Sequence, residues 1–268
     1  MTDLPRKVKV GAWVGGFLFW TVLLLLQSDG GLPLADAILV AVLLVAVPAF
    51  ALAQLPLVAD VPVARLPAYW GSIAALWMIG SSSWLVGSRS GGAASVGLVG
   101  LSPVGLLGWA AALTIACLLV VLVFRQLAIW AGAVESPLLR DLLPRTAKER
   151  RVFALLSLAA GVGEELAYRG YAILVLAPLV GTWGAVVLTS VVFGVLHAYQ
   201  GLLGMVRTAL MGGVLAWGFL ASGSLWPAII AHVALDLLAG LAFGERLLPP
   251  ARPASVVGAA PRSPVTER

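Results

Sequence analysis

The sequence has little charge. Asp, Glu, Lys and Arg make up 11% of its 268 residues, whereas about 25% is usual in soluble domains. Hydrophobic residues make up 61% of the chain, which excludes a soluble globular domain and indicates an integral membrane protein. The net charge of +5 is not gathered into a cluster of basic and aromatic residues, so we expect the lipid bilayer as a partner and no nucleic acid.

Cysteine and histidine are also scarce. Cys117 is the only cysteine, which excludes a disulfide within the chain, and its apolar neighbours predict a small buried thiol. There are only two histidines, and the HExxH pattern of soluble zinc proteases is absent. The GxSxG pattern of serine hydrolases is absent as well, although serines on separate helices could still pair with a base.

Long apolar stretches fill most of the chain. Bounded by Gly, Pro and charged residues, they predict eight helices, at 10–27, 34–58, 67–87, 104–124, 152–179, 182–198, 204–221 and 225–244. The predicted fold class is therefore all-α, a polytopic membrane protein with about eight transmembrane helices. The first apolar run is too long for a signal peptide and lacks a cleavage site, so we expect it to be retained. No internal repeat is evident, which leaves an inverted-repeat transporter without support.

The basic residues predict the orientation in the membrane. With eight alternating helices, every Lys and Arg except Arg89 and Arg169 falls on the side of the two termini. Cytoplasmic loops carry an excess of Lys and Arg, so both termini are predicted to be cytoplasmic in a multi-pass protein of the cell (plasma) membrane. The predicted organisation is a cytoplasmic N-terminus (1–9), four N-terminal transmembrane helices (10–124), a cytoplasmic basic connector with a short surface helix (125–151), a four-helix core (152–246) and a disordered cytoplasmic tail (247–268).

Ionisable residues stand out within the apolar helices of this core. They are Glu164, Glu165 and Arg169 in "GVGEELAYRG", His197 in "VVFGVLHAYQ", and His232 and Asp236 in "IIAHVALDLL". Glu165 and Arg169 are four residues apart, as are His232 and Asp236, so each pair shares a helical face. An ionisable group in the middle of a bilayer costs about 2.5–3.5 kcal/mol on insertion scales, so each of these residues needs a partner or a function.

Several roles are compatible with this set. Interhelical packing suits Glu165 and Arg169, but packing contacts more often use Ser, Thr, Asn or Gln. A glutamate base assisted by histidines could activate water for hydrolysis. A second possibility is that Glu164, His197 and His232 bind a divalent metal such as zinc. The same groups could instead form a proton or ion pathway.

Three motifs in this region resemble one family. "EELAYR" (164–169) fits EExxxR, "FGVLH" (193–197) fits FxxxH, and "HVALD" (232–236) fits HxxxN/D. In this order on late helices they resemble the CPBP family of intramembrane proteases, which contains type II CAAX prenyl endopeptidases and bacteriocin-processing or immunity-type (Abi) proteins. The resemblance covers about residues 150–245.

The resemblance implies an eight-helix core with a catalytic cavity, so that the 152–246 core would be catalytic and the chain an intramembrane endopeptidase. Glu164 and His197 would activate the water, and His232 and Asp236 would lie at the oxyanion position. The last position is commonly Asn, which can donate a hydrogen bond, whereas Asp236 can donate only when protonated.

The family also leaves alternatives open. Arg169 would pair with Glu165 or shape the cavity. Members are often called metalloproteases, yet a glutamate–water mechanism needs no metal, and some relatives act mainly by binding. The expected substrate is a membrane-associated protein or peptide, prenylated or not.

Overall fold

The computed structural model describes residues 6–28, 31–58, 63–133 and 136–248, and within these ranges the chain is helical with no β-strand. The α-helices are α1 (Arg6–Gln27), α2 (Leu34–Ala41), α3 (Val47–Val58), α4 (Arg65–Gly87), α5 (Pro103–Trp130), α6 (Pro137–Asp141), α7 (Ala147–Glu164), α8 (Leu174–Val180), α9 (Thr182–Leu196), α10 (Gly201–Ser222) and α11 (Trp226–Leu237). Three π-helical segments continue them without a break: η1 (Val42–Ala46), η4 (Glu165–Ile173) and η6 (Leu238–Phe243). Short 3-10 turns are η2 (Ser88–Ser90), η3 (Gly92–Val96), η5 (Ala198–Gln200) and η7 (Gly244–Leu247).

Each predicted long helix overlaps one continuous helical segment, which confirms the all-α polytopic fold class. Five of the described helices are long and apolar enough to cross a membrane: Val10–Gln27, Leu34–Pro56, Pro103–Trp130, Ala198–Ser222 and Trp226–Phe243. Thr182–Leu196 is apolar but shorter. The α7–η4–α8 segment carries Glu164, Glu165 and Arg169, which lowers its hydropathy.

Several boundaries differ from those expected. The stretch between the predicted helices 67–87 and 104–124 contains η2 and η3, because its small residues allow tight 3-10 turns. The connector is shorter than 125–151, because α5 continues to Trp130 and α7 already begins at Ala147. Its predicted short helix is present as α6. The predicted tail, 247–268, lies outside the described residues except for its first two positions.

Local sequence fixes the start of α7, the helix that leads into the site. Thr146 and Glu149 form a capping box: the Thr146 hydroxyl accepts from the backbone N–H of Glu149, whose carboxylate accepts from the backbone of Thr146. Hydrogen bonds from the backbone N–H groups of Thr146 and Arg145 hold the pKa of Glu149 below its usual range.

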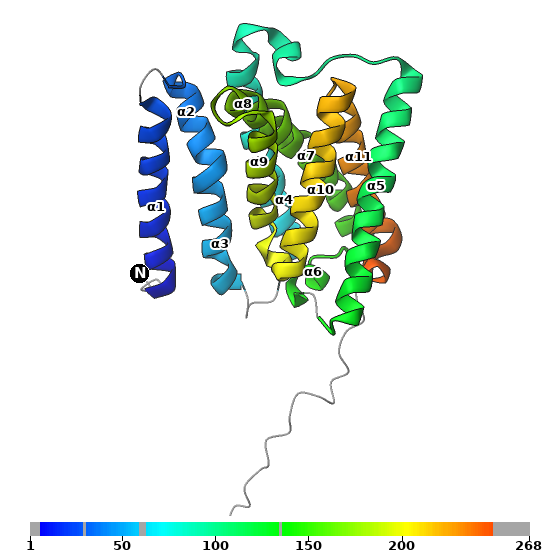
Figure 1. The fold of residues 1–268 in the computed structure, drawn as a ribbon. Helices are drawn as coiled ribbons and strands as arrows, with labels where there is room; N and C mark the ends of the chain where they lie inside the picture. Colours follow the sequence, from blue (N-terminus) through cyan, green and yellow to red (C-terminus); the bar gives the residue numbers. More distant parts are fainter. Residues whose placement is uncertain (1–5, 29–30, 59–62, 134–135, 249–268) are drawn as a thin grey trace, which may run out of the picture.

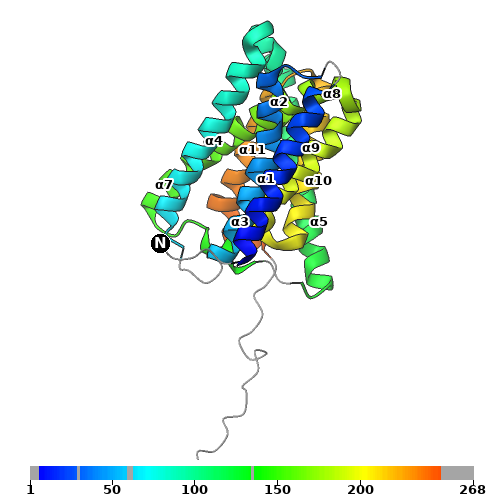
Figure 2. The ribbon, with the colours of Figure 1, turned by 90° about the vertical axis from the view of Figure 1, so that its left-hand side faces the viewer.

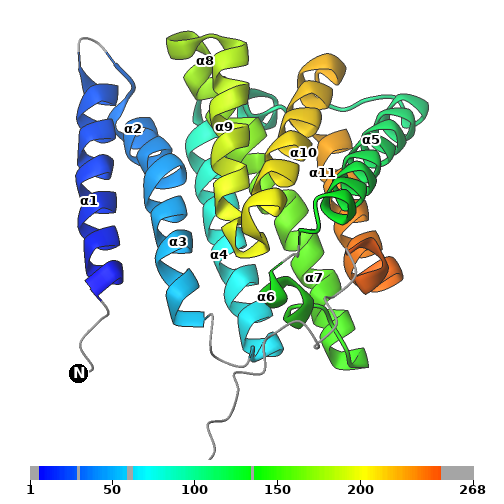
Figure 3. The ribbon, with the colours of Figure 1, turned by 60° about the horizontal axis from the view of Figure 1, so that its bottom comes forward.

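The helices run side by side in alternating directions, with α1 at one edge of the molecule and α5 at the other (Figure 1). Helix α4 packs against α7, and α9 packs against α10 (Figures 2 and 3). The α4–α7 crossing is close because two glycines meet there. A Cβ added to Gly80 would lie 2.7 Å from the Cα of Gly163.

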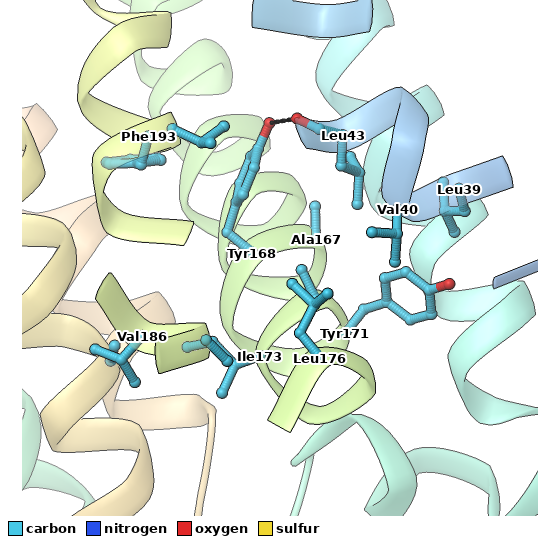
Figure 4. Packing of buried hydrophobic residues seen from close by; sticks show 14 residues of the cluster. Leu39, Val40, Leu43, Ala167, Tyr168, Tyr171, Ile173, Leu176, Val186 and Phe193 are labelled. Atoms are coloured by element: carbon cyan, nitrogen blue, oxygen red, sulfur yellow. Dashed lines mark hydrogen bonds between the residues drawn. The ribbon is translucent and has the colours of Figure 1, made fainter. Parts of the chain in front are cut away.

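The π-helical segment η4 lies at the centre of the largest buried cluster (Figure 4). Its Tyr168 hydroxyl donates to the carbonyl oxygen of Leu43 in η1, and its Tyr171 hydroxyl donates to Asp36 Oδ1 in α2 over 2.9 Å. Asp36 also pairs with Arg89. These contacts attach the N-terminal α1–α3 unit to the rest of the bundle.

Candidate active site

The predicted site residues come from three helical segments that meet inside the bundle. Glu164 is the last residue of α7 and Glu165 the first of η4, so they lie where the α-helix widens into a π-helix. His197 ends α9 as its C-cap, and His232 lies within α11. π-helical turns inside α-helices frequently occur at functional sites.

Glu165 and Arg169 form a buried ion pair behind the site. Arg169 Nη1 donates to Glu165 Oε1 over 2.9 Å, and the two side chains are 1% and 0% exposed. The guanidinium carbon of Arg169 also lies 4.2 Å from the centre of the Phe193 ring, a cation–π distance. The pairing expected from their four-residue spacing is therefore present.

The same carboxylate holds His232. Glu165 Oε1 lies 2.8 Å from His232 Nδ1, so it accepts hydrogen bonds from both the imidazole and Arg169. A carboxylate can only accept here, so Nδ1 carries a hydrogen and the ring orientation is fixed. The hydrogen bonds that link Arg169, Glu165 and His232 therefore direct His232 Nε2 away from Glu165.

On that side His232 Nε2 faces two further carboxylates. It lies 3.7 Å from Glu164 Oε2 and 3.9 Å from Asp236 Oδ2. These separations exceed a direct hydrogen bond but suit groups that share one small bridging molecule. The pair His232 and Asp236 is thus on one face of α11, as its spacing predicts.

The second histidine is oriented by its own helix. His197 Nδ1 lies 2.8 Å from the carbonyl oxygen of Phe193. A carbonyl oxygen can only accept, so Nδ1 carries the hydrogen and Nε2 of the neutral ring is an acceptor. The Phe193 ring contacts both histidines, with ring centres 4.8 Å from His197 and 6.1 Å from His232.

A cavity of about 680 Å³ brings the four predicted catalytic residues together. Glu164, His197, His232 and Asp236 all line it, and most of the remaining wall is apolar. Glu165 and Arg169 are not among the lining residues; they support the wall from behind.

Among the polar wall residues that were not expected from the sequence, three lie near His197 in the chain. Tyr199 and Gln200 follow His197 in η5, and Arg207 lies in α10. Arg207 was placed among the basic residues flanking the membrane, whereas the structure buries it at 7% exposure. Its position inside the apolar 204–221 window was the available signal.

The residues do not form a three-ligand metal site. In the described part of the chain, no group of three or more His, Cys, Asp or Glu side chains is arranged to hold a metal ion. The possible ligand set of Glu164, His197 and His232 lines one cavity without that closer arrangement.

One known family is similar to this part of the chain. Residues 146–238 match the sequence profile of the family described as type II CAAX prenyl endopeptidase Rce1-like. Over these residues the chain is similar to that family. The match agrees with the CPBP resemblance and indicates a protease of the CAAX type that works in a membrane. Comparisons with curated proteins and with solved structures gave no significant match.

Proposed function

We propose that this chain is an intramembrane endopeptidase that hydrolyses a peptide bond of a membrane-associated protein or peptide, using water activated by Glu164 and His197. The observation that carries the proposal is the convergence of Glu164, His197, His232 and Asp236 on one largely apolar cavity. Their chemistry suits hydrolysis, which needs a base, a group to orient water and a donor to the oxyanion.

The proposed reaction begins with a water molecule between Glu164 and His197. Glu164 accepts a proton from this water while the acceptor Nε2 of His197 orients it, and the oxygen attacks the carbonyl carbon of the substrate. The C–O bond forms as the carbonyl π electrons move to the oxygen, which becomes an oxyanion. Glu164 then returns the proton to the peptide nitrogen as the C–N bond breaks, releasing an acid and an amine.

His232 is proposed to stabilise the oxyanion. A donor at Nε2 requires a doubly protonated ring, and the carboxylate of Glu165 at Nδ1 supplies the matching negative charge at 2.8 Å. Asp236 lies on the same side as Nε2, where it helps to hold that proton toward the reacting oxygen. The Arg169–Glu165 pair supports this geometry without touching the cavity.

The shape of the cavity favours a substrate that arrives through the bilayer. Phe50 of α3 and Met78 of α4 line the cavity and are 67% and 64% exposed. We infer that the cavity opens to the bilayer between these helices. An extended apolar segment, with or without a lipid group, can enter there without crossing water.

The proposed orientation follows from the same arrangement. The start of α1, the start of α4, the end of α5 and α6 lie at one end of the molecule, and the end of α4, where η2 begins, lies at the other (Figure 1). Among the described residues, the segments at the first end contain most of the Lys and Arg residues. We infer that it is cytoplasmic in a plasma-membrane protein.

A peptide-library assay tests the proposed function. The full chain is reconstituted in liposomes and incubated with apolar peptides in farnesylated and unmodified forms, and products are identified by mass spectrometry. Wild type should cleave a subset, and Glu164→Gln should bind the same peptides without forming product, because an amide cannot accept the proton.

The matched control is Glu149→Gln, which should retain activity, since Glu149 is not among the residues that line the cavity and a glutamine can also complete a capping box. Proton or ion flux through wild-type liposomes without cleavage of any peptide would support the pathway function instead. Binding without cleavage by wild type would indicate an immunity-type binding protein.

A further inference from the structure

Unpartnered polar atoms gather behind the proposed active site. In the described part of the chain, four buried side-chain nitrogen or oxygen atoms have no hydrogen-bond partner. Three of them are Arg169 Nη2, Glu165 Oε2 and Ser190 Oγ. Buried polar groups are nearly always hydrogen-bonded, because leaving one unsatisfied is costly, so this concentration at one place needs a physical reason.

Arg169 and Ser190 meet beside Gly212 of α10. A Cβ added to Gly212 would lie 3.0 Å from Arg169 Nη2 and 3.5 Å from the Cα of Ser190, so both residues reach the same point. A serine hydroxyl oxygen is two bonds from its Cα, and one water molecule can join two polar groups that do not touch. A hydrogen bond between the two side chains, direct or through one water, is therefore within reach.

The neighbouring hydroxyl shows how Ser190 differs from other hydroxyl residues of the bundle. Thr189 Oγ1 donates to the carbonyl oxygen of Ala185 over 2.9 Å, a bond to the preceding turn that serine and threonine often form within helices. Ser83 and Ser157 form the same bond in α4 and α7. Ser190 Oγ has no such partner among the described residues, so its hydroxyl is available to Arg169.

Helix α9 thus contacts the Arg169 guanidinium on two sides. Phe193, three residues after Ser190, places the centre of its ring 4.2 Å from the guanidinium carbon, while Ser190 lies near Nη2. The other arm, Nη1, donates to Glu165 Oε1, which also holds His232 Nδ1. Fixing the plane of the guanidinium therefore fixes the carboxylate that orients the imidazole.

We propose that Ser190 is a positioning residue, whose hydroxyl accepts a hydrogen bond from Arg169 Nη2, directly or through one water molecule. The inference rests on the proposed function and adds a residue that does not line the cavity. Without this acceptor the guanidinium can turn in its plane and offer both arms to the two oxygens of Glu165, since such paired bonds are favourable. That turn draws Glu165 Oε1 away from His232 Nδ1.

The test uses two matched pairs of variants of the full chain in liposomes. Ser190→Ala removes the acceptor, whereas Thr189→Val removes the adjacent hydroxyl, whose partner lies in its own helix. Gly212→Ala places a Cβ 3.0 Å from Arg169 Nη2, whereas the Cβ of Gly213→Ala would meet Ser190 Oγ only at 3.9 Å. In each pair the first variant should lower kcat for peptide cleavage about tenfold with KM unchanged, and the second should keep wild-type values. Ser190→Thr should keep most of kcat because it retains the hydroxyl.

Nitrogen NMR of isotope-labelled histidine rings separates this inference from the proposed function. The chain has only two histidines, so the spectrum of His197→Gln identifies the signals of His232. In wild type, His232 should carry a hydrogen on Nδ1. In Ser190→Ala and Gly212→Ala, a measurable share of the rings should carry a hydrogen on Nε2 alone, because Glu165 no longer holds Nδ1.

Each outcome decides one of the two proposals. A loss of the Nδ1 hydrogen in Ser190→Ala, in a chain whose wild type cleaves no peptide, supports the positioning role and overturns the protease proposal. An unchanged His232 signal in Ser190→Ala, or an equal loss of kcat in Thr189→Val, overturns the positioning role and leaves the protease proposal in place. Thermal unfolding of each variant is recorded, and if Ser190→Ala does not fold, Gly212→Ala and Ser190→Thr decide by the same two measurements.

Discussion

Two ion pairs with the same spacing allow a matched test of the buried Glu165–Arg169 pair. Glu165–Arg169 and Asp141–Arg145 both join an acid to an arginine four residues later, at 2.9 Å and 3.5 Å. The first pair is 0% and 1% exposed and the second is 52% and 60% exposed, so the two differ mainly in burial.

The perturbation is Arg169→Met, with Arg145→Met as its control. Removing one partner of a buried pair leaves the other charge uncompensated, so we expect Arg169→Met to lower the free energy of unfolding by about 3–5 kcal/mol. The loss includes the contact over the Phe193 ring. An exposed pair of this spacing contributes only about 0.3–0.5 kcal/mol, so Arg145→Met should change stability little.

Stability is measured by denaturant titration of each variant in the same detergent, with peptide cleavage recorded in parallel. The double variant Glu165→Leu with Arg169→Met should recover much of the lost stability, because neither member of the pair is left without the other, yet it should not recover cleavage, because His232 loses Glu165. If Arg169→Met unfolds as wild type does and only turnover falls, the pair is not structural and Arg169 belongs to the catalytic set.

Four further outcomes follow from the structure. Gly163→Ala should destabilise the α4–α7 crossing, since its Cβ would lie 2.5 Å from a backbone oxygen, whereas Gly71→Ala, with open space around it, should be neutral by thermal unfolding. Reporter fusions at residue 140 and after residue 250 should both score cytoplasmic, and an external score at either site would overturn the orientation. Because backbone hydrogen bonds lower the pKa of Glu149, the stability that it provides is present above the usual glutamate pKa of about 4.3 and is lost as the pH falls through the lowered value. Glu149→Gln should therefore reduce the acid sensitivity of the thermal midpoint. Dialysis against a chelator should leave peptide cleavage unchanged, and loss restored by zinc would show that a metal is required.

The helices were predictable because the bilayer limits what can cross it. A span needs about 20 apolar residues, so hydropathy and the Gly, Pro and charged boundaries locate each segment. The conformation within a segment was not predictable in the same way. Nothing in "ELAYRGYAI" distinguishes a π-helix from an α-helix, since the wider turn depends on what packs against it.

The site was predictable in part. Four-residue spacing predicted that Glu165 could pair with Arg169 and that His232 and Asp236 would share a face. The contact between Glu165 and His232 joins residues 67 positions apart and depends on how α11 packs against η4, so no local pattern encodes it. Their catalytic roles, including those of Glu164 and His197, stay predictions until the variants are measured.

The network behind the cavity also explains why a buried charge is useful at this place. A well-packed apolar pair of similar volume is often as stable as a buried ion pair or more so, so stability alone does not account for Glu165 and Arg169. Glu165 Oε1 has a second partner, His232 Nδ1, and this bond determines which nitrogen of the imidazole faces the cavity. An apolar residue at position 165 could fill the same space but could not select that orientation. Arg169 donates to the same Glu165 oxygen, so the pair fixes the position of this carboxylate and thereby the direction of His232.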